Sequence, residues 1–191
     1  MATLFVDKID PQSGTTLSLG TSGDTLQATS GTTNNLGISE VDHWRITADF
    51  VGSGSGNQIL TANWERADSE NFAVKGTGMT ESSGIFTFPS TGYWLIATNY
   101  YMKAVGGART YAGSATQITT NNSSYETVMS TYGSCYANLA YACPNITCVF
   151  RNTDTSNCKV RLVMEGEDSI TTQGGTDDTK TGVTFIKLAA L

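Results

Sequence analysis

The stretch ESSGIFTFPSTGYWLIATNYYM, residues 81–102, decides the fold and raises a question, because both faces of its second half are apolar. Successive side chains of a β-strand point to opposite faces, and one face usually meets water. One side of this strand carries Tyr93, Leu95, Ala97 and Tyr101. The other side carries Trp94, Ile96, Tyr100 and Met102. The pattern therefore predicts a strand that is buried on both faces.

The composition around this stretch indicates one domain built from short strands. The chain has 191 residues, enough for a single domain with a core and a short extra segment. Apolar residues make up 39% and charged residues 15%, and 20 glycines accompany many threonines and serines. This composition is typical of strands joined by turns.

Charge and hydropathy exclude several classes of partner. The net charge of -6 argues against nucleic acid, since affinity for phosphates depends on lysine and arginine. No apolar run reaches the roughly 18 residues that span a membrane, and MATLFVDKID lacks the basic start and apolar core of a signal peptide. We therefore expect a soluble chain without membrane insertion and without an export signal of its own.

The lengths of the apolar runs change near residue 40, and this change divides the chain into two predicted parts. Residues 1–39 alternate short apolar patches with Thr, Ser and Gly turns, and they carry too little apolar surface to fold alone. We predict an extended arm that orders against symmetry mates or a larger assembly; a disordered tail is the alternative. Residues 40–191 hold longer apolar runs without a helical stripe, which predicts an all-β sandwich or jelly roll.

Seven runs in the second part are predicted strands, each bounded by Gly, Asn, Ser or Pro. They are DHWRITADF (42–50), GIFTFPS (84–90), GYWLIATNYYMKAV (92–105), SYETVMSTYGSCY (124–136), ITCVFRN (146–152), CKVRLVMEG (158–166) and TGVTFIKLAAL (181–191).

Four motifs resemble the jelly-roll domain shared by the globular head of the complement q component and the tumour necrosis factor family. They are DHWRITADF, NWERAD (63–68), GTGMTESSGIFTFPSTGYWLIA (76–97) and GVTFIKL (182–188). FTFPSTGYW is the hallmark, and the motifs look most like the version of this domain in marine bacteriophage virion proteins. The opening arm is similar to the beginnings of phage fibre proteins. The resemblance implies a homotrimeric jelly roll with its termini near one end and loops at the other.

The resemblance also implies where the second apolar face is buried. If Tyr93, Leu95 and Tyr101 fill the sandwich, then the opposite side of the strand fills a three-fold interface, or the reverse assignment holds. A monomeric sandwich with a helix or loop over that face is the alternative. The residues assigned to the trimer interface or the core are Trp94, Ile96, Tyr100, Met102, Tyr93, Leu95 and Phe185.

Residues typical of catalysis or metal binding are sparse. His43, the single histidine, lies in an aromatic strand without the partners of a triad, so we expect a packed histidine. A polysaccharide-degrading spike would need paired acids such as Glu65 with Asp68 or Glu165 with Asp168, but nothing places them across a sugar. The carboxylates of EGEDS (165–169) are expected in solvated turns rather than at calcium. We expect no enzyme, no cofactor and no metal.

The four cysteines lack the close pairs of a zinc site. If residues 146–162 form a hairpin centred on Thr153, Cys148 and Cys158 face each other across it and are a candidate disulfide. A one-residue change of register would remove this pairing. Cys135 and Cys143 either pair or remain as small buried apolar residues, and whether the four are oxidised stays open.

These observations predict a non-enzymatic bacteriophage virion structural protein on the virion surface, assembled in the host cytoplasm. Its arm docks on capsid or tail proteins, and the trimeric knob serves as a capsid decoration or a short tail fibre that reinforces the shell or binds a host-surface glycan. Recognition is expected in two polar loops at the end far from the arm. Their residues are Asn121, Asn122, Tyr125, Gln173, Asp177 and Asp178. A secreted complement- or cytokine-like module that recognises a protein receptor is the alternative.

Overall fold

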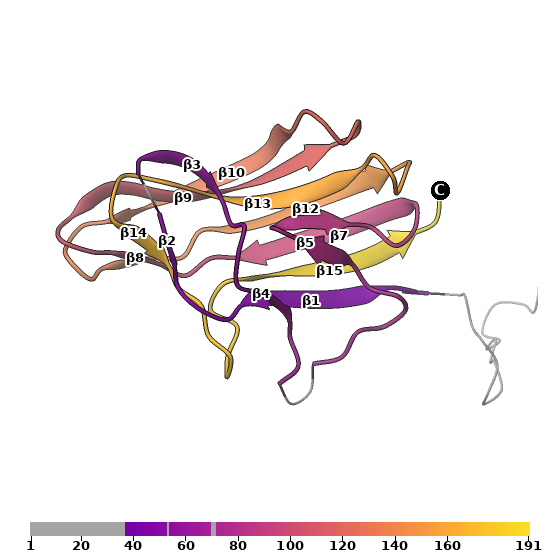
Figure 1. The fold of residues 1–191 in the computed structure, drawn as a ribbon, viewed down its shortest axis with the longest axis horizontal. Coiled ribbons are helices and arrows are strands. Elements are labelled where there is room, and N and C mark those ends of the chain that lie inside the picture. Colours follow the sequence, from indigo (N-terminus) through magenta and orange to yellow (C-terminus); the bar gives the residue numbers. More distant parts are fainter. Residues whose placement is uncertain (1–36, 53, 70–71) are drawn as a thin grey trace, which may run out of the picture. The chain divides into compact units, whose positions relative to one another are not determined.

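The computed structural model describes residues 37–52, 54–69 and 72–191 (Figure 1). Within these residues the chain forms fifteen strands and no helix. The predicted arm, residues 1–39, therefore lies almost wholly outside the described residues. The part of the chain described here also contains no helix with the length and apolar character needed to cross a bilayer.

Two antiparallel sheets and a small third sheet build the domain. The first sheet has the order β12-β7-β15-β1-β4. Its strands are β1 (Val41–Ile46), β4 (Trp64–Arg66), β7 (Gly92–Asn99), β12 (Asn145–Asn152) and β15 (Gly182–Ala189). The first, seventh, twelfth and fifteenth strands are thus neighbours although they are far apart in sequence, as in a jelly roll.

The second sheet has the order β10-β9-β13-β6-β5, with β3 also paired to β13. Its strands are β3 (Gly56–Ile59), β5 (Thr80–Ser82), β6 (Ile85–Thr87), β9 (Arg109–Thr119), β10 (Glu126–Cys135) and β13 (Lys159–Gly166). The third sheet, with the order β11-β8-β14-β2, contains β2 (Phe50–Val51), β8 (Met102–Ala104), β11 (Tyr141–Ala142) and β14 (Ile170–Thr172).

Aromatic rings from both main sheets fill the space between them. The Phe88 and Trp94 rings have centroids 5.2 Å apart, and Phe86 lies 5.2 Å from Phe185. Of the seven residues assigned to the interface or the core, five are fully buried in this core. They are Trp94, Ile96, Tyr100, Met102 and Phe185. The side of β7 that carries Trp94 and Ile96 therefore fills the sandwich, and Tyr93 and Leu95 lie on the outer face of the first sheet.

Each predicted strand overlaps a strand of the structure. Of the strands that were not predicted, β9 is the longest. This strand, RTYAGSATQIT, is the longest of those described and lies in the middle of the second sheet. The sequence did not predict this strand because most of its buried positions hold Ala, Gly, Ser or Thr rather than large apolar side chains.

The predicted hairpin over residues 146–162 is wrong, and the Cys148–Cys158 disulfide falls with it. β12 pairs with β7 in the first sheet, whereas β13 pairs with β9 and β6 in the second sheet. The chain between them crosses from one sheet to the other instead of folding back. Both cysteines are free thiols, as are Cys135 and Cys143.

The predicted recognition loops lie at opposite ends of the sandwich, so their expected placement together at one end is wrong. The turn at 120–125 follows β9, whose Thr119 pairs with Lys159, and Asn122 N donates to Asn157 O at 2.9 Å. This is the end where β1 begins and β15 ends, termed the proximal end (Figure 1). Residues 171–178 instead lead from β14 toward Gly182, at the other end, termed the distal end.

Candidate functional site: the outer face of the first sheet

An apolar row crosses four strands on the outer face of the first sheet. The register pairs Val149 with Leu95, Leu95 with Ile186, and Ile186 with Val41. Cross-strand partners point to the same face, and the inward face here carries Trp94 and Ile96. The Val149 side chain is 58% exposed, and the other three members are half-buried or partly exposed. This set of four residues is termed the apolar row.

The neighbouring positions on the same face carry small or aromatic side chains. The row next to it pairs Thr147 with Ala97, Ala97 with Thr184, and Thr184 with His43. On the other side of the apolar row, Tyr93 is exposed and pairs with Arg151. Small residues beside an apolar row leave a flat face that suits close contact with another protein surface.

His43 lies on β1, on this same outer face, next to Thr184. Its ring stacks on Phe72 with centroids 4.9 Å apart, while Nδ1 lies 2.8 Å from Thr184 Oγ1 and Nε2 lies 3.0 Å from Thr179 Oγ1. Burial lowers the pKa of this imidazole, with a smaller opposing effect of Asp42. The ring thus packs between a phenylalanine and two hydroxyls, as expected for a structural strand histidine.

The carboxylates considered as catalytic pairs serve other purposes. Arg45, almost fully buried, places Nη2 2.8 Å from Glu65 Oε1 and 2.7 Å from Asp68 Oδ1. Glu65 and Asp68 therefore neutralise one buried guanidinium. Glu165 is buried on the second sheet and accepts a hydrogen bond from the Tyr132 hydroxyl.

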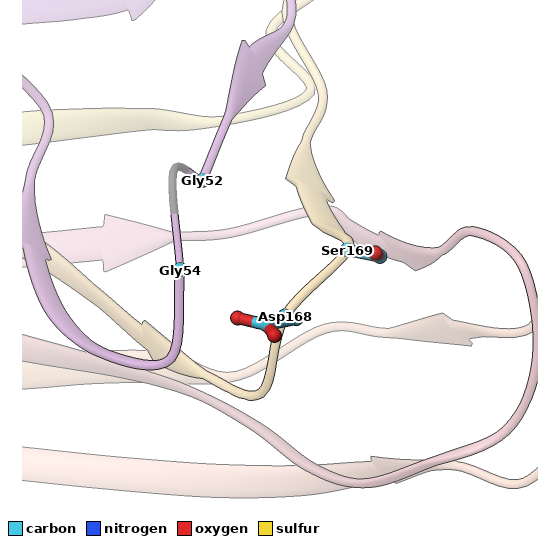
Figure 2. A pocket seen from close by; sticks show the side chains of 4 residues that line it. All are labelled: Gly52, Gly54, Asp168 and Ser169. Carbon is cyan, nitrogen blue, oxygen red and sulfur yellow. The ribbon is translucent and has the colours of Figure 1, made fainter.

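The acidic stretch 165–169 does not converge on one point. Glu167 Oε2 accepts a hydrogen bond from Thr110 N at 3.1 Å. Asp168 lines a shallow cavity of about 300 Å³ together with Gly52, Gly54 and Ser169 (Figure 2). Within the described residues, no three His, Cys, Asp or Glu side chains are grouped so as to hold a metal ion.

The proximal loop is built by its own side chains. Asn121 Oδ1 accepts from Ser123 N and Ser124 N, both at 3.0 Å, so this amide holds the turn. The guanidinium of Arg161 lies 3.9 Å from the centroid of the Tyr125 ring, and burial raises the pKa of that phenol. A cavity of about 180 Å³ opens beside the turn. It is lined by Ile118, Thr120, Asn121, Ser124, Glu126, Val128 and Phe150.

The distal loop presents carboxylates. Gln173 continues β14 through a backbone hydrogen bond to Tyr101 O at 2.8 Å, while Asp177 and Asp178 are exposed. The structure therefore separates the six predicted recognition residues into a braced turn at one end and an acidic loop at the other.

Sequence reasoning missed three of the four residues of the apolar row, namely Val149, Ile186 and Val41. The signal was present in GVTFIKL, where Val183 and Phe185 alternate with Thr184 and Ile186, so that both faces of that strand carry an apolar residue. Two neighbouring strands with apolar residues on both faces indicate a sheet whose outer face also meets protein.

No protein-family model and no curated protein sequence matches the chain. Solved structures are similar to it in fold. Murine APRIL matches with a TM-score of 0.57 at 15% identity, over 78% of this chain and 98% of that one. Eiger, a TNF from S. frugiperda, matches with a TM-score of 0.58 at 14% identity, over 81% of this chain and 95% of that one. The expected fold, a jelly roll of the tumour necrosis factor type, is confirmed.

Proposed function

We propose that the chain is a non-enzymatic virion structural protein of a bacteriophage, which assembles as a homotrimer and is carried on the virion surface. The apolar row on the outer face of the first sheet carries the proposal. Full burial of an exposed apolar side chain contributes about 1.5–3 kcal/mol. Val149 is the most exposed member of the row and the other three are already partly buried, so each adds less than this but all favour assembly. The motif resemblance to trimeric phage virion proteins supports the same conclusion.

In this proposal the arm, residues 1–39, docks on capsid or tail proteins, and the jelly roll from residue 40 onward forms the knob. β1 begins at the proximal end, so a knob attached through the arm displays its distal loops (Figure 1). The knob then acts as a capsid decoration or a short fibre that reinforces the shell or meets the host surface.

A matched pair of variants tests the self-association. Val149 and Val51 are both exposed valines, at 58% and 66%, but only Val149 lies in the apolar row. Val149→Asp should shift the protein from trimer to monomer in sedimentation velocity at micromolar concentration, because each contact would bury a carboxylate without a partner. Val51→Asp should remain a trimer. A wild-type monomer, or a trimer that tolerates Val149→Asp, would refute the proposal.

A second candidate is a secreted complement- or cytokine-like module that recognises a protein receptor, and the structural similarity to murine APRIL and to Eiger TNF favours it. Particles that lack the native protein separate the two functions. A virion protein co-sediments with such particles when added as the full chain and fails to do so when residues 1–39 are deleted. A receptor-binding module does not associate with the particles in either form.

A further inference from the structure

A cluster of exposed apolar side chains lies at the distal end, outside every loop considered so far. It comprises Val105, Tyr136, Leu139 and Tyr141, of which Tyr136 is 86% and Leu139 52% exposed. Val105 follows β8, and the other three lie between β10 and the start of β11. This set of four residues is termed the tip. Exposed apolar side chains on adjacent segments are typical of contact surfaces.

Backbone hydrogen bonds fasten the two segments of the tip to each other. Leu139 N donates to Ala104 O at 2.9 Å, and Ala104 N donates to Ala140 O at 3.0 Å. Gly106 N donates to Asn138 Oδ1 at 2.8 Å, which ties the segment after β8 to the loop again. The tip is therefore one ordered unit rather than two independent loops.

Leu139 has a backbone conformation that leucine rarely adopts. Its φ is 64°, in the left-handed region, where a side chain with a Cβ costs about 1–2 kcal/mol. Glycine or asparagine is the usual choice at such a position. Since half of the Leu139 side chain is exposed, burial within the domain does not explain why leucine occupies this position. Backbone strain of this kind is concentrated at functional sites.

The polar groups around the tip hold the backbone in place. Arg109 donates from Nη2 to Val105 O at 3.0 Å and from Nη1 to Ala108 O at 2.8 Å. Its Nε donates to Asp168 O, and Val105 N donates to Ser169 O at 2.9 Å. A surface that is already ordered loses little conformational entropy when it binds.

We propose that the tip is a binding surface for another protein, whose contact region is apolar and flanked by basic side chains. Aliphatic and aromatic side chains together suit a protein partner. A sugar needs hydrogen-bonding side chains, but Arg109 and Asn138 are engaged with the backbone. Two basic side chains, Lys103 and Arg109, also lie at this end, but both are partly buried and Arg109 is engaged with backbone carbonyls. Basic groups are expected on the partner because the exposed charges there are acidic, as at Asp168, Asp177 and Asp178. The proposal that the tip faces away from the particle rests on the proposed function. The proposal that the tip binds a protein does not.

Leu139→Gly tests the proposal because it removes the side chain and suits the existing φ. The variant should melt at the same or a higher temperature than the wild type, since glycine relieves the strain. Tyr136→Ser is the second variant, and Val74→Ser, an exposed valine outside the tip, is the control. A lower melting temperature for Leu139→Gly would overturn the argument from strain.

The binding probe is a random peptide library displayed on yeast and selected on the wild-type protein. Enriched peptides should combine apolar residues with Lys or Arg and bind more weakly as salt is added. They should bind Leu139→Gly and Tyr136→Ser at least about tenfold more weakly, and Val74→Ser unchanged. Peptides that bind all variants equally would refute the proposal, as would tip-dependent binding to a neutral glycan array without peptide binding.

Sedimentation of the two tip variants separates this inference from the proposed assembly. Both should associate as the wild type does, whatever state that is. Loss of association in Leu139→Gly would make the tip a contact between copies of this chain and would overturn the proposal.

Discussion

The carboxylate of Asp42 anchors the first strand, and removing its charged partner should be costly. Asp42 is 1% exposed and accepts hydrogen bonds from Trp44 Nε1 at 2.8 Å and from Met79 N at 2.6 Å. Arg66 completes the site, donating from Nε at 2.8 Å and from Nη2 at 3.1 Å. Its guanidinium also lies 4.9 Å from the centroid of the Trp44 ring.

Arg66→Met keeps the length of the side chain and leaves the buried carboxylate with only neutral donors. Removing one partner of a buried ion pair costs about 3–5 kcal/mol. The Arg66 side chain is 38% exposed, so water replaces part of the interaction and we expect the lower limit, about 3 kcal/mol. Loss of the contact with Trp44 adds about 0.5–1 kcal/mol. The total is large against a usual domain stability of about 5–15 kcal/mol.

Urea unfolding followed by tryptophan fluorescence measures the effect, at one fixed protein concentration because the proposed self-association would contribute to stability. Lys75→Met, at an exposed lysine outside the apolar row, should change the free energy of unfolding by less than about 0.5 kcal/mol. Asp42→Asn should make the Arg66→Met substitution much less costly, since no buried charge then remains. A loss below about 1 kcal/mol for Arg66→Met in the wild-type background would refute this reasoning.

Three further outcomes follow from single residues. The free energy of unfolding should fall as the pH drops through 6.5, because His43 takes up a proton there in the unfolded chain, while burial lowers its pKa in the folded chain. Urea titrations at several pH values should show a smaller fall of this free energy in His43→Gln. Maleimide labelling followed by mass spectrometry should modify exposed Cys143 first and buried Cys158 only on unfolding, and equal rates would contradict the burial. Gly84→Ala should lower the free energy of unfolding by about 2 kcal/mol or more in thermal denaturation, because φ is +80° and the new Cβ would lie 2.2 Å from Leu60 O. An unchanged midpoint would contradict that geometry.

The sequence predicted the class of fold because its strongest strands alternate clearly. In β7 the inward positions hold Trp94 and Ile96, and the motif FTFPSTGYW places the preceding aromatic strand beside them. Strand β9 could not be found in this way. At Gly113 a Cβ would lie 2.2 Å from Tyr132 Cδ1, so the neighbouring strand supplies the ring that covers this position. Hydrophobicity read along one strand does not show what its neighbour supplies.

The hairpin error has a similar cause. Only six residues separate β12 from β13, a length that suits a hairpin as well as a crossover between sheets. The choice depends on which partners compete for each strand. β7 pairs with β12 along its whole length, from Asn145 with Asn99 to Asn152 with Gly92, and β9 pairs with β13. These pairings join segments far apart in the chain, so the loop sequence alone does not specify them. The placement of the two recognition loops at one end failed for the same reason.

The apolar row and the core share strands, and this makes folding and assembly separable by substitution. Along β7, Leu95 points outward next to Ile96, which points into the sandwich; the register carries this alternation across β12 and β15. A polar residue at Val149 or Leu95 therefore changes the outer face while the aromatic packing inside stays intact. The tip lies on loops at the distal end, apart from both. If both proposals hold, substitutions at three separate sets of positions should change stability, self-association and contact with other proteins independently, and each change has its own measurement.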